Sequence, residues 1–262
     1  ADLGDIFVND AFSVSHRKHA SIYGLAKLLP SYAGLALQLE IEMLEKVLKD
    51  SEPPTIAIVG GSKVSTKLNL LSNLMEKAKY IAIGGGMANT FLAAKGVDIG
   101  ASFYEKSMLK NAVQICKKAE KLGCEIILPV DVVVANKIEH GTDTEMVDID
   151  NIDSDKMILD IGNKTIDLIC NAIANSKTLL WNGPLGVFEV PPFDHSTSSC
   201  ALTVAMLTRA GGLVSVAGGG DTVSALNNAE ASGGFSYVSV AGGAFLEWIE
   251  GKTLPGISVL NK

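Results

Sequence analysis

The sequence predicts an α/β protein with a doubly wound, Rossmann-like parallel sheet flanked by helices on both faces. Six short apolar runs rich in β-branched residues, most of them ending in or near glycine, are typical of strands buried on both faces. Segments with helical spacing separate these runs. Alternating strands and helices imply right-handed crossovers and a parallel sheet, with ligands bound at the carboxyl ends of the strands.

The six predicted strands follow one another from residue 55 to residue 243. They are TIAIVGG from Thr55, KYIAIGGG from Lys79, EIILPVDVVVA from Glu125, TLLWNGPLG from Thr178, GLVSVAGGG from Gly212 and YVSVAGG from Tyr237. Apolar residues three and four apart predict two of the helices. These residues are Leu68, Leu71, Met75 and Ala78 after the first strand, and Leu37, Ile41, Leu44 and Leu48 in a long amphipathic helix before Pro53-Pro54.

Two regions do not fit the alternation. In residues 1–33 we expect a strand followed by the segment HRKHAS and a turn region before Pro30. These few elements are too small to form a hydrophobic core alone. Residues 136–162 contain many Asp and Asn residues and predict a solvated excursion. The chain begins with Ala1 and not with Met, so we expect a fragment of a longer protein.

The composition excludes several classes of protein. With 47% hydrophobic and 19% charged residues the chain is globular and not disordered. A formal net charge of −7 argues against a nucleic-acid partner, so local features must hold any phosphate. The apolar runs are shorter than the about 20 residues of a membrane span, and we expect no secretory signal. Cysteines without C-x-x-C spacing predict reduced core thiols in a cytoplasmic protein; they are Cys116, Cys124, Cys170 and Cys200.

The motif GGSKVSTK, from Gly60 to Lys67, is a candidate phosphate site. Its glycines end a strand, Ser62 is placed to cap a helix, and Lys63 and Lys67 fall four apart on the first turns, where free N–H groups favour anions. Neither G-x-x-x-x-G-K-[ST] nor G-x-G-x-x-G occurs. A capped helix with exposed lysines explains the motif equally well.

Two more glycine-containing motifs follow strands. GGGMANTF from Gly84 suits close approach of the backbone to a flat ring, or tight helix packing. WNGPLGVFE from Trp181 predicts a rigid loop that presents Asn182 and Glu189 to an adenosine ribose or a metal-bound phosphate; a plain turn is the alternative.

The stretch SVAGG occurs twice. In the first copy, from Ser215, the glycines lead to Asp221, whose carboxylate would repel a phosphate unless a cation bridged the two. Asp221 also suits a helix N-cap. In the second copy, from Ser239, an alanine replaces the acid.

The segment HRKHAS, from His16 to Ser21, follows the first predicted strand. Arg17 suits bidentate binding of a phosphate or carboxylate. His16 and His19 lie three apart, a spacing that occurs in metal sites, but no third ligand lies nearby. A solvated loop is the alternative.

Together these motifs resemble those of the phosphoglycerate kinase family. NDAFSVSHRKHAS, GGSKVSTKL, GGGMANTFL, LPVDVVVA, DIGNKT, WNGPLGVFE, GGGDT and GGAFLEWIEGKTLPG stand in that family's order and spacing across essentially the whole chain. The resemblance implies a cytoplasmic, monomeric, hinge-bending enzyme of glycolysis. It would pass a phosphoryl group between 1,3-bisphosphoglycerate and ADP, giving 3-phosphoglycerate and ATP, with Mg²⁺.

The resemblance also implies roles for single residues. It assigns Arg17 to the phosphate of the substrate and Asp221 to the metal. It implies catalytic roles for Lys63, Lys67, Gly219 and Gly242, and nucleotide-binding roles for Gly60, Gly61, Lys67, Gly84, Asn182, Pro184, Gly186, Glu189, Gly219, Gly220, Asp221 and Thr222.

By the same resemblance the chain divides into four segments. Residues 1–33 are the remnant of an N-terminal substrate domain, 34–50 an interdomain helix, 51–245 a nucleotide-binding domain, and 246–262 a segment returning toward the N-terminal domain. The family usually has Ser-Thr-Gly-Gly where this chain has Ser239, Val240, Ala241 and Gly242.

Because most of the family's first domain lies outside this chain, an inactive nucleotide-binding module is the alternative function. A nicotinamide dehydrogenase would need a dinucleotide loop, which the sequence lacks.

Overall fold

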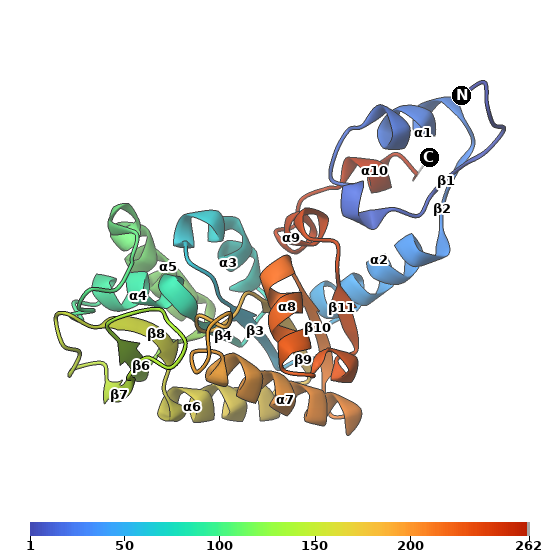
Figure 1. The fold of residues 1–262 in the computed structure, drawn as a ribbon. Coiled ribbons are helices and arrows are strands. Elements are labelled where there is room, and N and C mark those ends of the chain that lie inside the picture. Colours follow the sequence, from blue (N-terminus) through green and yellow to red (C-terminus); the bar gives the residue numbers. More distant parts are fainter. Residues whose placement is uncertain (261–262) are drawn as a thin grey trace.

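A six-stranded parallel sheet forms the centre of the molecule in the computed structural model, which describes residues 1–260 (Figure 1). Its spatial order is β11-β10-β9-β3-β4-β5, and all neighbouring strands pair in parallel. The strands are β3 (Thr55–Val59), β4 (Tyr80–Ile83), β5 (Glu125–Ile127), β9 (Thr178–Asn182), β10 (Val214–Gly218) and β11 (Tyr237–Ser239). Counted within the sheet, the order is 3-2-1-4-5-6, that of doubly wound dinucleotide-binding folds. The predicted fold class is confirmed.

Helices cover both faces of this sheet. Along β3, Ala57 and Val59 belong to one core cluster and Ile56 and Ile58 to another, because successive side chains of a strand point to opposite faces. The first cluster includes residues of α2 (Leu35–Leu48), α3 (Leu68–Leu74), α4 (Gly85–Ala94), α5 (Leu109–Leu122) and α9 (Gly243–Ile249), and the second includes residues of α6 (Asn163–Ala174), α7 (His195–Arg209) and α8 (Gly220–Asn228).

The predicted solvated excursion at residues 136–162 is correct only in part: residues 136–158 are exposed or half-buried, but residues 159–162 are buried and the segment forms strands. Two strands, β7 (Glu145–Asp148) and β8 (Met157–Ile161), flank β6 (Asp131–Ala135) in an antiparallel sheet of order β7-β6-β8. The run from Glu125 is therefore not one strand, since β5 and β6 belong to different sheets. β7 is largely exposed, and an antiparallel strand with one face toward solvent carries many polar residues. This exposure explains why the composition suggested a loop.

The first residues of the chain form a separate small layer. β1 (Phe7–Asn9) and β2 (Ser31–Ala33) pair in parallel, and α10 (Pro255–Ser258) packs back onto this layer, since Gly256 N donates to Ser15 O at 2.8 Å. Figure 1 shows α2 leading from this layer to the main sheet. The predicted boundary between residues 245 and 246 falls inside α9. The remaining short helices are α1 (Leu25–Leu28), η1 (Phe12–Val14), η2 (Ala20–Gly24), η3 (Val64–Thr66), η4 (Lys106–Met108) and η5 (Ser232–Gly234).

The joining helix also contacts the edge of the main sheet. Glu40 of α2 is buried, and its carboxylate accepts hydrogen bonds from the hydroxyls of Tyr237 and Ser239 on β11. These hydrogen bonds join α2 to β11, the edge strand of the main sheet.

All four cysteines are free thiols. Cys124 and Cys200 are buried, whereas Cys116 and Cys170 are partly exposed, so the prediction of core thiols holds fully for only two of them. No helix within residues 1–260 has both the length and the apolar character of a membrane span.

Candidate functional site

The sheet order reverses between β3 and β9, and the ends of these two strands are in backbone contact. Gly60 N donates to Asn182 O at 3.0 Å. A Cβ on Gly60 would lie 1.8 Å from Pro184 O, so only glycine fits there. Ligands of doubly wound sheets bind in the crevice at such a switch point.

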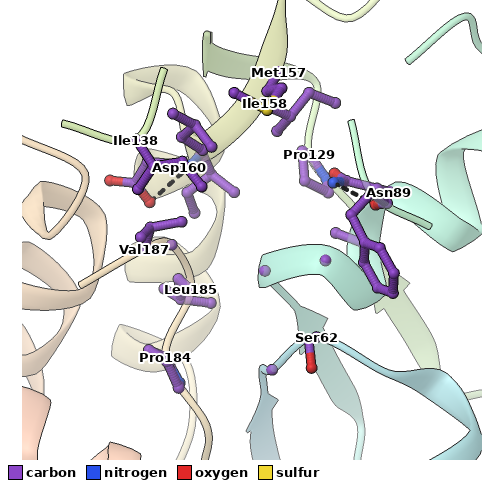
Figure 2. Close-up of a pocket in the computed structure, with 18 of the residues that line it drawn as sticks. Ser62, Asn89, Pro129, Ile138, Met157, Ile158, Asp160, Pro184, Leu185 and Val187 are labelled. Carbon is purple, nitrogen blue, oxygen red and sulfur yellow. Dashed lines mark hydrogen bonds between the residues drawn. The ribbon is translucent and has the colours of Figure 1, made fainter. Parts of the chain in front are cut away.

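A pocket of about 430 Å³ opens beside this contact (Figure 2). Figure 2 shows Pro184, Leu185 and Val187 on one wall, Ser62 and Asn89 on another, and Met157 and Ile158 at the far end. Five residues predicted to bind nucleotide line it: Gly61, Pro184, Gly186, Glu189 and Asp221. The strand ends thus bring together motifs that lie up to 160 positions apart, from residue 61 to residue 221. Most of the remaining lining is apolar, as in small-molecule sites.

Lys67 lies beside the switch point, partly buried. Its Nζ donates to Asn182 Oδ1, and Asn182 Nδ2 donates to Gly218 O at 2.6 Å, which ties the ends of β9 and β10 together. Burial lowers the pKa of Lys67, while the charges of Glu250 and Asp221 act in the opposite direction. The structure therefore holds one cation against the strand ends, close to two carboxylates.

The prediction that Lys63 and Lys67 share one face of a helix is wrong. Residues Val64–Thr66 form a 3₁₀ turn, α3 begins only at Leu68, and Ser62 does not cap it. Ser65 instead bonds to the carboxylate of Glu105, at 2.9 Å through its N–H and 2.5 Å through its hydroxyl. Lys63 is exposed and lies outside the pocket lining.

Asp221 lies in the first turn of α8 and lines the pocket. Gly219 is the N-cap, with φ +104°, and Asp221 makes no side-chain cap bond, so the structure does not support the N-cap alternative. Gly220 is the first residue of the helix. Thr222 is buried, and its hydroxyl accepts a bond from Gly183 N at 2.7 Å. The Asp221 carboxylate is thus left available to the pocket.

The protein alone offers too few side-chain ligands to bind a metal ion here, so a bound substrate would have to supply the others. Within residues 1–260 no group of three or more His, Cys, Asp or Glu residues is placed to hold an ion. Asp221 fits Mg²⁺ nevertheless, because proteins commonly bind this ion through one or two carboxylates together with phosphate oxygens of the substrate.

Arg17 and Gly242 lie outside the pocket lining. Arg17 Nε donates to His16 Nε2 at 3.1 Å, and a Cβ on Gly243 would lie 3.2 Å from that same nitrogen. HRKHAS therefore reaches the start of α9, beside the second SVAGG copy. There Gly242 has φ +51° and Val240 is 82% exposed.

Gly84 packs against the loop that follows β9, which carries Pro184 and Leu185. It is the N-cap of α4, and a Cβ there would lie 2.7 Å from Leu185 Cα. Gly85 N donates to Leu185 O at 2.7 Å. Of the two uses predicted for GGGMANTF, tight packing is thus observed at Gly84.

The sequence interpretation missed Asp160, which supports the pocket wall. Its buried carboxylate accepts bonds from Ser196 N at 3.0 Å, from the Ser196 hydroxyl and from Ile161 N at 2.9 Å. Burial raises the pKa of Asp160 to about 7. A Cβ on Gly186 would lie 2.2 Å from Asp160 Oδ1, so the wall rests directly on this side chain. The only signal was one acid inside the apolar stretch MILDIG.

Fold and site together define a Rossmann-like α/β protein whose ligand pocket lies at the switch point, with a cation and a carboxylate at its edge. A family model described as phosphoglycerate kinase matches residues 1–252. The chain belongs to the phosphoglycerate kinase family.

Individual relatives agree with this assignment. The chain is 57% identical over 259 residues to the phosphoglycerate kinase of Rhizobium meliloti (strain 1021), which covers 99% of this chain and 65% of the relative. It is 56% identical over 258 residues to that of Caulobacter vibrioides (strain NA1000 / CB15N), covering 98% and 65%. The chain thus spans about 65% of the length of these curated relatives.

Solved structures show the same similarity. Phosphoglycerate kinase from Coxiella burnetii superposes with a TM-score of 0.95 at 43% identity, covering 99% of this chain and 66% of that one. The enzyme from Pyrococcus horikoshii OT3 gives a TM-score of 0.83 at 28% identity, covering 99% and 64%.

Proposed function

We propose that the protein transfers a phosphoryl group between 1,3-bisphosphoglycerate and ADP, giving 3-phosphoglycerate and ATP. The observation that carries the proposal is the position of Lys67, bonded to Asn182 at the strand ends and within the electrostatic reach of Asp221. In the transfer, an oxygen of the ADP β-phosphate attacks the acyl phosphate, whose P–O bond breaks to release a carboxylate. Such reactions depend mainly on positioning and charge neutralisation.

We assign the residues as follows. The pocket takes the nucleoside, with Glu189 near the ribose, and Lys67 and the N-terminus of α8 meet the phosphates. Asp221 holds Mg²⁺, which would neutralise phosphate charge. Lys63 and the backbone of Gly219 and Gly242 act on the transferred group. The other proposed nucleotide contacts are those of Gly60, Gly61, Gly84, Asn182, Pro184, Gly186, Gly220 and Thr222.

The substrate side of the site would be provided by Arg17. Because this residue lies in the layer of β1 and β2, across α2 from the main sheet, transfer requires the two parts to close by bending at a hinge. Residues 1–33 and 246–262 would then belong to a substrate unit, 34–50 to the joining helix and 51–245 to a nucleotide unit. Closure would also exclude water from the phosphoryl group.

We further propose a cytoplasmic monomer without a nucleic-acid partner. Four free thiols suit a reducing compartment, and a net charge of −7 disfavours binding to a polyanion. Light scattering would test the monomeric state.

Turnover by the 262-residue chain decides between the two candidate functions. Incubated with 1,3-bisphosphoglycerate and MgADP, the chain should form ATP above background, and Asp221→Asn should reduce the rate. An inactive module would bind MgADP without forming ATP. This second candidate is favoured by one observation, that the chain covers only 65% of its relatives.

A further inference from the structure

Two of the four cysteines lie on neighbouring helices. Cys170 belongs to α6 and Cys200 to α7, and Figure 1 shows these helices side by side along the main sheet. Both side chains take part in the same core cluster, Cys200 as a buried member and Cys170 as a partly buried residue packed against it. Neither cysteine lines the pocket at the switch point, so the proposed phosphoryl transfer leaves both thiols unused.

A threonine on α7 shows that the two thiols face each other. Cys170 Sγ donates to Thr203 Oγ1 at 3.5 Å, a bond that joins α6 to α7. Cys200 and Thr203 are three residues apart, and residues with this spacing share one face of a helix. The side chain of Cys200 is therefore on the face of α7 that meets Cys170, and its thiol donates a hydrogen bond to the Cys170 sulfur.

The two thiols differ in accessibility and in acidity. Cys170 is partly exposed, whereas Cys200 is fully buried. The hydrogen bond from Cys200 lowers the pKa of Cys170, and the same bond together with burial raises the pKa of Cys200. Because the thiolate is the nucleophile, a small oxidant that arrives from solvent meets a reactive sulfur only at Cys170. Cys200 then lies in position to attack an oxidised Cys170.

We propose that Cys170 and Cys200 form a peroxide-reactive dithiol, in which Cys170 reacts with a hydroperoxide and Cys200 then closes a disulfide between α6 and α7. In the first step the Cys170 thiolate attacks the O–O bond, which breaks to give a sulfenic acid and an alkoxide or hydroxide that takes a proton from water. In the second step the Cys200 sulfur attacks the sulfenic sulfur, and the hydroxyl group leaves as water with the Cys200 proton. The hydroperoxide is reduced and the two thiols are oxidised.

The other two cysteines provide an internal comparison. Cys116 is partly exposed, as Cys170 is, but burial raises its pKa. Burial also raises the pKa of Cys124, to about 11. Both remain protonated thiols at pH 7, so partial exposure alone does not make Cys116 a good nucleophile.

Peptide mapping of the unmodified chain gives the first test. The chain would be treated with hydrogen peroxide at pH 7, unfolded in iodoacetamide and mapped by mass spectrometry without reduction. We expect a cross-linked pair of peptides that contains Cys170 and Cys200, while Cys116 and Cys124 carry the alkyl label. Cys170 should be consumed about tenfold faster than Cys116, because its larger thiolate fraction outweighs the lower nucleophilicity of a more acidic thiol.

The Cys200→Ala variant separates the two steps. Without the second thiol, oxidation should stop at the sulfenic acid of Cys170, which dimedone traps, and no disulfide should form. The matched control is Cys116→Ala, which also removes one thiol but leaves the pair intact. This control should form the disulfide between Cys170 and Cys200 as the unmodified chain does.

Three results would overturn the inference. They are free thiols at both Cys170 and Cys200 after peroxide treatment, consumption of Cys116 as fast as Cys170, and a Cys200→Ala variant in which dimedone does not label Cys170. If Cys200→Ala does not fold, the peptide map and the two rates in the unmodified chain decide. Phosphoryl transfer takes no part in this reaction, so its success or failure leaves the outcome unchanged.

Discussion

Replacing Gly60 with alanine should force apart the two strand ends that form the switch point. The added Cβ would lie 1.8 Å from Pro184 O and 2.7 Å from Gly183 O. Ordinary contact begins at 3.4 Å, so one backbone must shift by about 1.6 Å, the difference between 3.4 and 1.8 Å. Because both obstacles are backbone atoms, no rotation of a side chain relieves the overlap.

The cost has two parts. Overpacking of this kind typically destabilises by about 1–3 kcal/mol. The shift would also lengthen the hydrogen bond from Gly60 N to Asn182 O, now 3.0 Å, which contributes about 1 kcal/mol. We therefore expect Gly60→Ala to lower the free energy of unfolding by about 2–4 kcal/mol. MgADP affinity should fall too, since Pro184 lines the pocket.

Urea unfolding followed by circular dichroism measures this change. Gly233→Ala is the matched control, because a Cβ there meets no atom within 4 Å and Gly233 is not among the glycines with positive φ. The control should stay within about 1 kcal/mol of the unmodified chain. Equal unfolding midpoints for Gly60→Ala and Gly233→Ala would refute the backbone contact.

Three other predictions follow from the site and its neighbours. Lys67→Met should weaken MgADP binding by about ten- to a hundredfold in calorimetry, since hydrogen bonds to charged groups contribute about 1.5–3 kcal/mol. Lys118→Met, which removes an exposed ion pair, should leave the affinity for MgADP unchanged. Equal affinities of the two variants would show that Lys67 does not contact the phosphates. The pKa of Asp160 is raised from 3.8 to about 7, so its protonated form stabilises the fold below pH 4 and this stability is lost as the pH rises through 7. The free energy of unfolding in urea should thus fall by up to about 3 kcal/mol between pH 5 and pH 8, and Asp160→Asn should flatten that slope; parallel profiles would contradict this origin. A hydrogen bond from a neighbouring thiol lowers the pKa of Cys170, whereas burial raises the pKa of Cys124 to about 11, so iodoacetamide at pH 7 should label Cys170 first in peptide mass mapping, and equal labelling would count against it.

The main sheet could be predicted from the sequence because its signals are local. An apolar run such as that of β3 is buried on both faces, and the glycines that follow it mark the turn into a helix. Those features do not depend on distant residues. The small sheet gave no such signal, because β7 is exposed and rich in acids, and its pairing with β6 joins segments of different composition.

Residue spacing also gave a wrong prediction of the local structure around Lys63 and Lys67. The spacing of Lys63 and Lys67 suits a helix, but Ser65 binds Glu105, which lies 40 positions further along the chain. This contact accompanies a 3₁₀ turn instead of a helical start. No spacing rule within GGSKVSTK could reveal it.

The sequence by itself determined the fold class, the family and the positions where strands give way to glycines and helices, because these follow from hydrophobic burial and backbone freedom along short segments. Only the tertiary structure decided which of these ends meet. The order β9-β3 sets Asn182 against Gly60, and Asp160 comes to lie under Gly186. Such contacts arise between residues far apart in the chain, where only the packed fold fixes distance, burial and hydrogen-bond partners.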